Sequence, residues 1–116
     1  MAIPELVRKT ALRQVETFCQ SRIPAFARDE IRLEFSLRGN SITIVERRPP
    51  WRPDFGPEWS SQNIAQLRYD PDTAQWSLYW RNRNSRWFLY PDAAASRDVG
   101  PLLAEVDRDP TGIFWG

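Results

Sequence analysis

Apolar and polar positions alternate along residues 30–47, and Gly39-Asn40 interrupts the alternation near its middle. A period of two is typical of a strand with one buried face. Gly-Asn between two such runs is typical of a two-residue hairpin turn. We therefore predict antiparallel strands over residues 30–38 and 41–47. Their inward positions are Ile31, Leu33, Phe35 and Leu37 on the first strand and Ile42 and Ile44 on the second.

Residues 63–90 show a related pattern and predict a meander of three antiparallel strands. Asp70-Pro71-Asp72-Thr73 has the composition of a tight turn, and Asn82-Arg83-Asn84-Ser85 that of a four-residue loop. Pairing Asp70 with Thr73, and Arg81 with Arg86, gives one consistent apolar face. The predicted core face holds Ala65, Leu67, Trp76, Leu78, Trp80, Trp87 and Leu89. The predicted outer face holds Ile64, Gln66, Arg68, Gln75, Ser77, Tyr79, Arg81, Arg86, Phe88 and Tyr90.

Two helices are expected to flank these strands. Apolar residues recur at helical spacing over residues 4–20, and Pro24 stops this helix because proline disfavours helix at the residue before it. A second helix is predicted over residues 96–107, with Ser96 as its N-terminal cap. Ile113-Phe114-Trp115 is a short apolar tail, which we expect to dock because exposed aromatic surface is unfavourable.

A chain of 116 residues is expected to form one domain, covering residues 1–116. The predicted class is α+β: an N-terminal helix, a five-stranded, mostly antiparallel, curved or partly barrel-like sheet, and a C-terminal helix with a docked aromatic tail. Residues 47–61 contain four Pro and one Gly, which predicts a loop. We expect the rings of Trp51, Phe55 and Trp59 to pack on the sheet or to line a groove.

Composition excludes several functional classes. The chain has no His and one Cys, Cys19, which excludes a Cys-His nucleophile pair, an internal disulfide and a cysteine metal cluster. Gly-rich phosphate loops, paired catalytic carboxylates and metal-ligand spacings are also missing from the sequence, so neither a metal nor a cofactor is expected. No stretch is apolar enough to cross a membrane and no signal peptide is visible, which predicts a cytoplasmic protein with no membrane partner.

Glu46 is the one candidate for acid-base chemistry. The hairpin register places it on the apolar face, where an unpaired carboxylate is costly. One interpretation is that the strand bulges or frays here and that Glu46 meets Arg48 or solvent. The other is a small enzyme on a phosphate-bearing substrate, with this carboxylate as base and Arg47, Asn82 and Arg83 as anion ligands.

Arginine and aromatic residues together suggest a binding surface. Fifteen of the sixteen basic residues are Arg, the side chain suited to bidentate recognition of phosphate and carboxylate. The net charge of +1 argues against binding a polyanion by bulk charge. Aromatic and Arg side chains share the predicted outer face, as in platforms that stack single-stranded nucleic acid. The candidate ligand-binding residues are Arg47, Arg48, Trp51, Tyr79, Arg81, Asn82 and Arg83.

Plainer interpretations stand beside this one. The loop at residues 82–85 has the composition of an ordinary solvated hairpin tip. A helix covering the outer face would turn its aromatic residues into a second core. The favoured hypothesis is a non-enzymatic binding module for an anionic ligand, single-stranded nucleic acid or a protein partner. A homodimer formed through the exposed aromatic face is a further alternative.

A resemblance to a known family rests on four segments: residues 46–51 (ERRPPW), 64–69 (IAQLRY), 76–80 (WSLYW) and 109–116 (DPTGIFWG). With these the chain resembles domain-of-unknown-function family 3024, small bacterial proteins, over nearly its whole length. No activity is established for the family, so the resemblance supports the fold. In the family's pattern the second hairpin reads Trp-x-Asp-Arg-Asn-x-x-Trp-His-x-Tyr. Here Asn82 replaces the Asp and Phe88 replaces the His, so the resemblance implies no acid-base role at either position.

Overall fold

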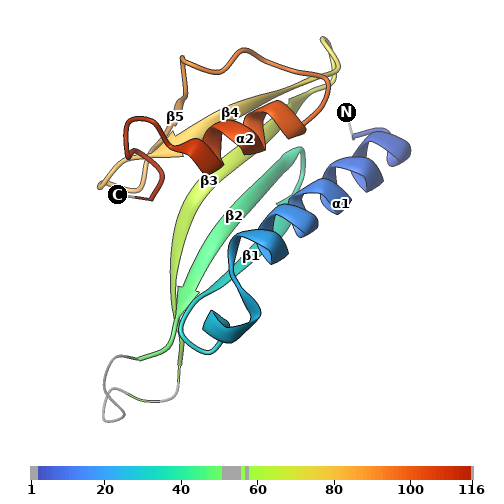
Figure 1. Cartoon of the computed structure of the whole chain (residues 1–116). Helices are drawn as coiled ribbons and strands as arrows, with labels where there is room; N and C mark the ends of the chain where they lie inside the picture. Colours follow the sequence, from blue (N-terminus) through green and yellow to red (C-terminus); the bar gives the residue numbers. More distant parts are fainter. Residues whose placement is uncertain (1–2, 51–55, 57, 116) are drawn as a thin grey trace.

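The computed structural model describes residues 3–50, 56 and 58–115, and its class is α+β, as predicted (Figure 1). Two α-helices accompany five strands, which follow one another as neighbours in a single antiparallel sheet of order β1-β2-β3-β4-β5. The sheet is not closed into a barrel. The elements are α1 (Glu5–Arg22), the 3-10 helix η1 (Ala25–Ala27), β1 (Arg32–Arg38), β2 (Ser41–Arg48), β3 (Ser60–Asp70), β4 (Gln75–Arg81), β5 (Trp87–Leu89) and α2 (Gly100–Arg108).

The first hairpin has the predicted register. Arg38 pairs with Ser41, and Phe35 pairs with Ile44. Gly39 adopts a φ of 58°, a left-handed conformation that glycine takes without steric cost. A β-bulge then interrupts the β2–β3 pairing between Ile44 and Val45.

Ile64 is the extra residue that this bulge accommodates. Ala65 pairs with Ile44 and Asn63 pairs with Val45, so Ile64 has no partner on β2. As a result both Ile64 and Ala65 are buried in the core. The prediction that Ile64 lies on the outer face was therefore wrong, because strict alternation does not survive a bulge.

The turn between β3 and β4 is longer than predicted. Asp70 pairs with Gln75 instead of Thr73, and Ala74 takes a φ of 55° to close the loop. The Asp70 carboxylate accepts a hydrogen bond from the Asp72 backbone N–H at 2.9 Å. This register differs from the predicted one by two residues, so every side chain of β4 keeps its predicted face.

The turn between β4 and β5 differs by one residue, and this reverses the faces of β5. The backbone N–H of Asn82 bonds to the carbonyl of Arg86, and Ser85 has a φ of 65°. This is a three-residue loop closed by a left-handed residue, one of the standard hairpin connections. Trp80 consequently pairs with Phe88 instead of Trp87.

Several predicted positions on β5 are therefore wrong. Trp87 and Leu89 lie on the outer face with Tyr79, and Leu89 is 56% exposed. Tyr90, predicted to face outward, is buried against Phe114 with ring centroids 5.1 Å apart. Phe88 shares the face of Trp80, with ring centroids 5.3 Å apart.

Helix α2 begins three residues later than predicted, at Gly100, because Val99 and not Ser96 is at its N-cap position. Ser96 is not its cap, because Ser96 exchanges two backbone hydrogen bonds with Trp76 on the free edge of β4. The Asp98 carboxylate accepts a bond from the Gly100 backbone N–H instead. At the other end, the Asp109 carboxylate accepts bonds from the backbone N–H groups of residues 114 and 115, which docks the tail as predicted.

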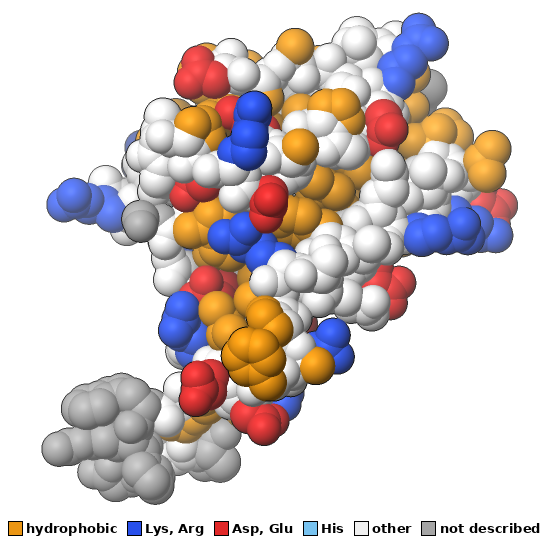
Figure 2. Space-filling model, in the orientation of Figure 1, with side chains coloured by type: hydrophobic (Ala, Val, Ile, Leu, Met, Phe, Trp, Pro, Cys, Tyr) orange, Lys and Arg blue, Asp and Glu red, His pale blue; other side chains and the backbone are white. Residues whose placement is uncertain are grey.

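Both helices cover the same face of the sheet, in front of it in Figure 1. Figure 2 shows apolar side chains gathered along the seam between the two helices. The core beneath them is built from α1, from the inward residues of β2, β3 and β4, and from α2. The largest fully buried side chains are Val15, Ile42, Ile44, Leu67, Trp76, Leu78, Tyr90, Val99, Leu102 and Val106. The opposite face of the sheet is not covered by either helix.

Candidate functional site

The uncovered face of the sheet holds a groove of about 510 Å³, which we call the open-face groove. It crosses β1, β2 and β3, and the side chain of Trp87 on β5 forms part of its wall. Its lining is mostly polar: Ser36, Arg38, Ser41, Thr43, Val45, Asn63, Gln66, Arg68 and Trp87. These residues share the face because the sheet register places outward positions of adjacent strands side by side.

Arg68 is the most firmly oriented charge in this groove. Its guanidinium carbon lies 3.9 Å from the ring centroid of Tyr79, a cation–π arrangement. Its Nε donates a hydrogen bond to Gln66 Oε1 at 2.6 Å, and Gln66 Nε2 donates to Thr43 Oγ1 at 2.9 Å. The Nη groups of Arg68 have no hydrogen-bond partner within the described part of the chain. They are therefore available to a planar or anionic group in the groove.

Positive charge is concentrated on this face. Its outward positions hold five Arg and two carboxylates, whereas the whole chain has a net charge of +1. The residues are Arg32, Arg38, Arg47, Arg68 and Arg81, with Glu34 and Asp70. Arg47 Nη1 pairs with Glu34 Oε2 at 3.3 Å, while its buried Nε finds no partner among the described residues. The remainder of the molecule is net negative, so an anionic ligand would be drawn to the open face.

A second concavity of about 560 Å³ contains Glu46, and we call it the helix-end groove. Its lining residues are Ser21, Arg22, Ile23, Ile31, Glu46, Arg48, Asp107 and Trp115. Glu46 faces the apolar side of the sheet opposite Leu33, as the register predicts, and only 13% of its side chain is exposed. Arg48 Nε donates to Glu46 Oε1 at 2.7 Å, so the carboxylate is paired.

The family model described as "Domain of unknown function (DUF3024)" matches residues 3–116, essentially the whole chain. The chain belongs to the DUF3024 family. No curated protein and no solved structure gives a significant match.

The structure of this DUF3024 protein separates the residues of the predicted anion cluster. Arg47 lies on the outer face, whereas Glu46, its neighbour in sequence, points inward. Asn82 and Arg83 lie in the β4–β5 turn, which contributes no residue to the helix-end groove. Among the predicted ligand residues that the structure describes, Arg48 alone lines the same groove as Glu46. The predicted Trp51 lies outside the described residues.

Asn82 has a structural task in this turn. Its side-chain oxygen accepts hydrogen bonds from the backbone N–H groups of Asn84 and Arg86, at 2.9 and 3.0 Å. An aspartate at this position could accept the same two bonds. Arg81 donates across the turn to the Ser85 hydroxyl, while Arg83 is exposed.

None of the residues that line the open-face groove is among the ligand-binding residues predicted from the sequence. Trp87 was assigned to the core by the one-residue error in register. Arg38 was placed outward, but nothing in the sequence links it to Trp87, which approaches it only because the sheet is curved. Tyr79 and Arg81 do lie on this face, as predicted.

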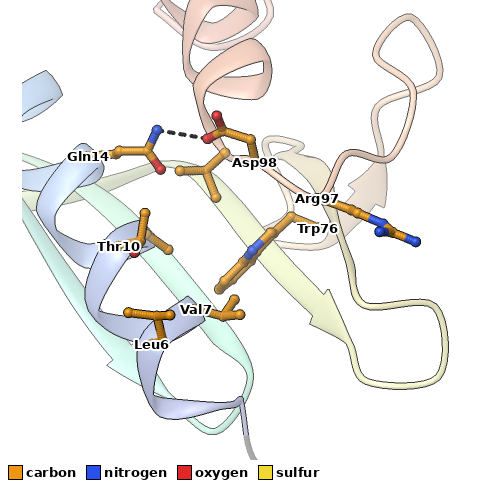
Figure 3. Close-up of a pocket in the computed structure, with 9 residues that line it drawn as sticks. Leu6, Val7, Thr10, Gln14, Trp76, Arg97 and Asp98 are labelled. Atoms are coloured by element: carbon orange, nitrogen blue, oxygen red, sulfur yellow. Dashed lines mark hydrogen bonds between the residues drawn. The ribbon is translucent and has the colours of Figure 1, made fainter.

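A third pocket, of about 260 Å³, lies between α1 and the segment that leads into α2 (Figure 3). The Trp76 ring and Val7 line it, and Gln14 Nε2 donates to Asp98 Oδ1 at 2.7 Å along one side. The Arg97 side chain points away from the pocket in Figure 3. This pocket offers apolar shape without a free charged group directed into it. No metal-binding group of three or more acidic, His or Cys side chains occurs in the described ranges. The helices described here include none that is long and apolar enough to span a membrane.

Proposed function

We propose that this DUF3024 protein is a non-enzymatic binding module that holds single-stranded nucleic acid on the open face of its sheet. One observation carries the proposal: an Arg68 guanidinium stacked on Tyr79 and oriented by Gln66, in a polar groove walled by Trp87. Single-stranded nucleic acid binds where a positive groove tracks the backbone and aromatic rings stack the bases.

The groove supplies each kind of contact that such a ligand needs. Arg38 is exposed and unpaired within the described residues, and Arg68 offers free Nη groups, so both are suited to phosphate. Trp87 is half-buried and lines the groove with a ring on which a base can stack. Asn63 and Gln66 carry amide groups that can bond to base edges. Because the net charge is only +1, affinity should depend on these local contacts and remain modest.

Fluorescence anisotropy with labelled single-stranded DNA and RNA oligonucleotides tests the proposal. Trp87→Ala should weaken binding about tenfold, because base–aromatic stacking is worth roughly 1–3 kcal/mol per base. Phe26→Ala is the matched control, since Phe26 is 89% exposed and lies outside the groove. Arg38→Ala should weaken binding and make its salt dependence shallower by about 0.7 in log–log slope, the release expected for one phosphate contact on a single strand. Arg13→Ala, an exposed arginine on α1, is the control for charge.

Failure of the wild type to bind either nucleic acid would refute the proposal. Equal weakening by Trp87→Ala and Phe26→Ala would show that binding occurs elsewhere. The remaining alternative is a homodimer formed through the open face, and sedimentation of the wild type and of Trp87→Ala tests it. A wild-type dimer that Trp87→Ala alone dissociates would make the open face a self-association surface.

An enzyme with Glu46 as base is a second candidate, favoured by the groove around this carboxylate. Arg48 would then be its anion ligand. Arg47, Asn82 and Arg83 lie elsewhere, and Arg22 is paired with Asp107. Loss of a measured phosphatase or phosphotransferase activity in Glu46→Gln would support it. We also propose a cytoplasmic location, which the free thiol of Cys19 suits.

A further inference from the structure

The helix-end groove is formed where both helices finish. In Figure 1, α1 and α2 run in the same direction, so their C-terminal ends lie on the same side of the molecule. Arg22, the last residue of α1, and Asp107, near the end of α2, both line the groove. Helix C-termini carry partial negative charge, which favours cations. The groove is therefore a poor site for a bare multivalent anion.

Arg22 lines this groove, and contacts within the protein already hold its side chain. Its Nη1 pairs with Asp107 Oδ1 at 2.5 Å, and its guanidinium carbon lies 4.0 Å from the ring centroid of Trp115. The Trp115 indole N–H donates to the Val106 carbonyl at 2.8 Å, which holds the ring in place. These contacts neutralise Arg22 and Asp107 against each other.

The ion pair of Glu46 and Arg48 uses only some of the hydrogen-bonding atoms of the two side chains. Arg48 Nε occupies Glu46 Oε1, but Glu46 Oε2 and both Nη groups of Arg48 have no hydrogen-bond partner in the part of the chain that the structure describes. Glu46 has 13% of its side chain exposed and Arg48 has 60%. The groove thus presents one negative acceptor and one positive fork next to each other, beside apolar Ile23 and Ile31.

We propose that the helix-end groove binds a free α-amino acid with an apolar side chain. The ammonium group would bond to Glu46 Oε2, where the helix C-termini favour it further. The carboxylate would take the two Nη groups of Arg48 in a bidentate pair. The apolar side chain would lie on Ile23, Ile31 and the Trp115 ring. A ligand with one positive and one negative group matches all of the unused charge, whereas a phosphate ester matches only half of it.

Two-dimensional NMR of isotope-labelled protein tests this with three probes. L-phenylalanine carries both groups, phenethylamine lacks the carboxylate, and 3-phenylpropanoate lacks the ammonium. L-phenylalanine should shift the Trp115 indole and the Ile23 amide signals at millimolar concentration. The other two probes should bind at least about tenfold more weakly, because each leaves one buried or oriented charge unpaired.

Variants locate the binding. Arg48→Gln should weaken L-phenylalanine binding about tenfold by removing the bidentate pair. The Arg48 side chain is exposed, so this variant should keep the wild-type fold. Glu46→Gln should act similarly, with a thermal melt to check folding. The matched controls are Glu34→Gln and Arg47→Gln, which break the corresponding pair on the open face.

Three results would overturn the proposal. One is no shift at about 10 mM L-phenylalanine, a concentration that detects even millimolar affinity. Another is equal affinity for all three probes, which would mean that neither Glu46 nor Arg48 contributes to binding. The third is equal weakening by Glu34→Gln and Glu46→Gln. None of these results bears on nucleic-acid binding at the open-face groove, so the two proposals fail independently.

Discussion

Tyr90→Phe removes one buried hydrogen bond and leaves the packing of the ring in place. The Tyr90 hydroxyl donates to Glu105 Oε1 at 3.0 Å, and the two residues are 2% and 7% exposed. Hydrogen bonds to charged groups contribute roughly 1.5–3 kcal/mol, and removal of a donor leaves a buried acceptor unsatisfied. The other Glu105 oxygen remains paired with Arg108, which limits the loss. We expect the free energy of unfolding to fall by about 2 kcal/mol.

Urea denaturation followed by circular dichroism at neutral pH measures this loss. In a separate thermal melt, the melting temperature should fall by about 8 °C, given roughly 4 °C per kcal/mol for a domain of this size. Tyr69→Phe is the control, since the Tyr69 ring is buried against Trp76 but its hydroxyl makes no side-chain hydrogen bond with any described residue. If Tyr90→Phe costs no more than Tyr69→Phe, the bond to Glu105 contributes nothing and the reasoning fails.

Alkaline pH gives an independent test of the same bond. Burial, and then the hydrogen bond to Glu105, raise the pKa of Tyr90 above its ordinary 10.0. The folded state therefore holds the phenol proton more tightly than the unfolded state does. The resulting stability is fully present below pH 10 and is lost as the pH rises through the folded pKa. The stability gap between wild type and Tyr90→Phe should narrow over that range, and a constant gap would contradict the assignment.

Three further predictions concern other parts of the fold. Trp80→Ala should destabilise by about 2–3 kcal/mol, below the roughly 3–5 of a fully enclosed aromatic, because Trp80 is only half-buried beneath Phe88; a melt unchanged from wild type would show that this ring does not serve the core. Cys19 should react with a thiol reagent at about pH 8 far more slowly in the folded than in the unfolded protein, since burial first and Glu16 second raise its pKa to about 12; equal rates in absorbance assays would contradict this. Asp98→Ala should lose stability only at neutral pH, because the hydrogen bond from the Gly100 N–H, and then Gln14, lower the pKa of Asp98. That contribution is present above the ordinary carboxyl pKa of 3.8 and lost as the pH falls through the folded value, so melts of the variant and wild type should converge in acid.

The first hairpin was predictable because two signals agreed. Gly39-Asn40 determined the position of the turn, and the alternation on each side determined which residues face the core. A turn placed one residue away would have put apolar residues opposite polar ones, so the two signals check each other. Helix α1 was predictable for a similar reason, since its apolar spacing and Pro24 mark the same end. Membership of the DUF3024 family was visible in short segments spread over the chain.

The second hairpin shows where local signals stop. A three-residue loop closed by a left-handed residue usually has Gly at that position, and here the residue is Ser85. Without the Gly, a four-residue loop was equally acceptable, and the error of one residue moved Trp87 from the groove to the core. The prediction of where α2 starts was wrong for another reason. Ser96 has the chemistry of a cap, but its backbone pairs with Trp76, a contact that depends on the folded sheet.

The open-face groove could not be predicted as a unit. Arg38 and Trp87 are far apart in sequence and meet only through the curvature of five paired strands. The helix-end groove likewise requires the ends of two helices to converge on Glu46 and Arg48 at the end of β2. In both cases the sequence shows what each side chain can bind. Which residues lie beside it in space depends on the tertiary structure.

The two free edges of the sheet differ in how open they are to strand addition by another chain. On the β5 side only three residues form a strand, and Pro91 follows shortly afterwards with no N–H to donate. The upstream half of β4 is occupied at Ser96, so an incoming strand finds little backbone to pair with there. The β1 edge has seven residues, with charged side chains at Arg32, Glu34 and Arg38. Such charges oppose edge-to-edge pairing. Fibril-like growth of this sheet is therefore blocked by length on one side and by charge on the other.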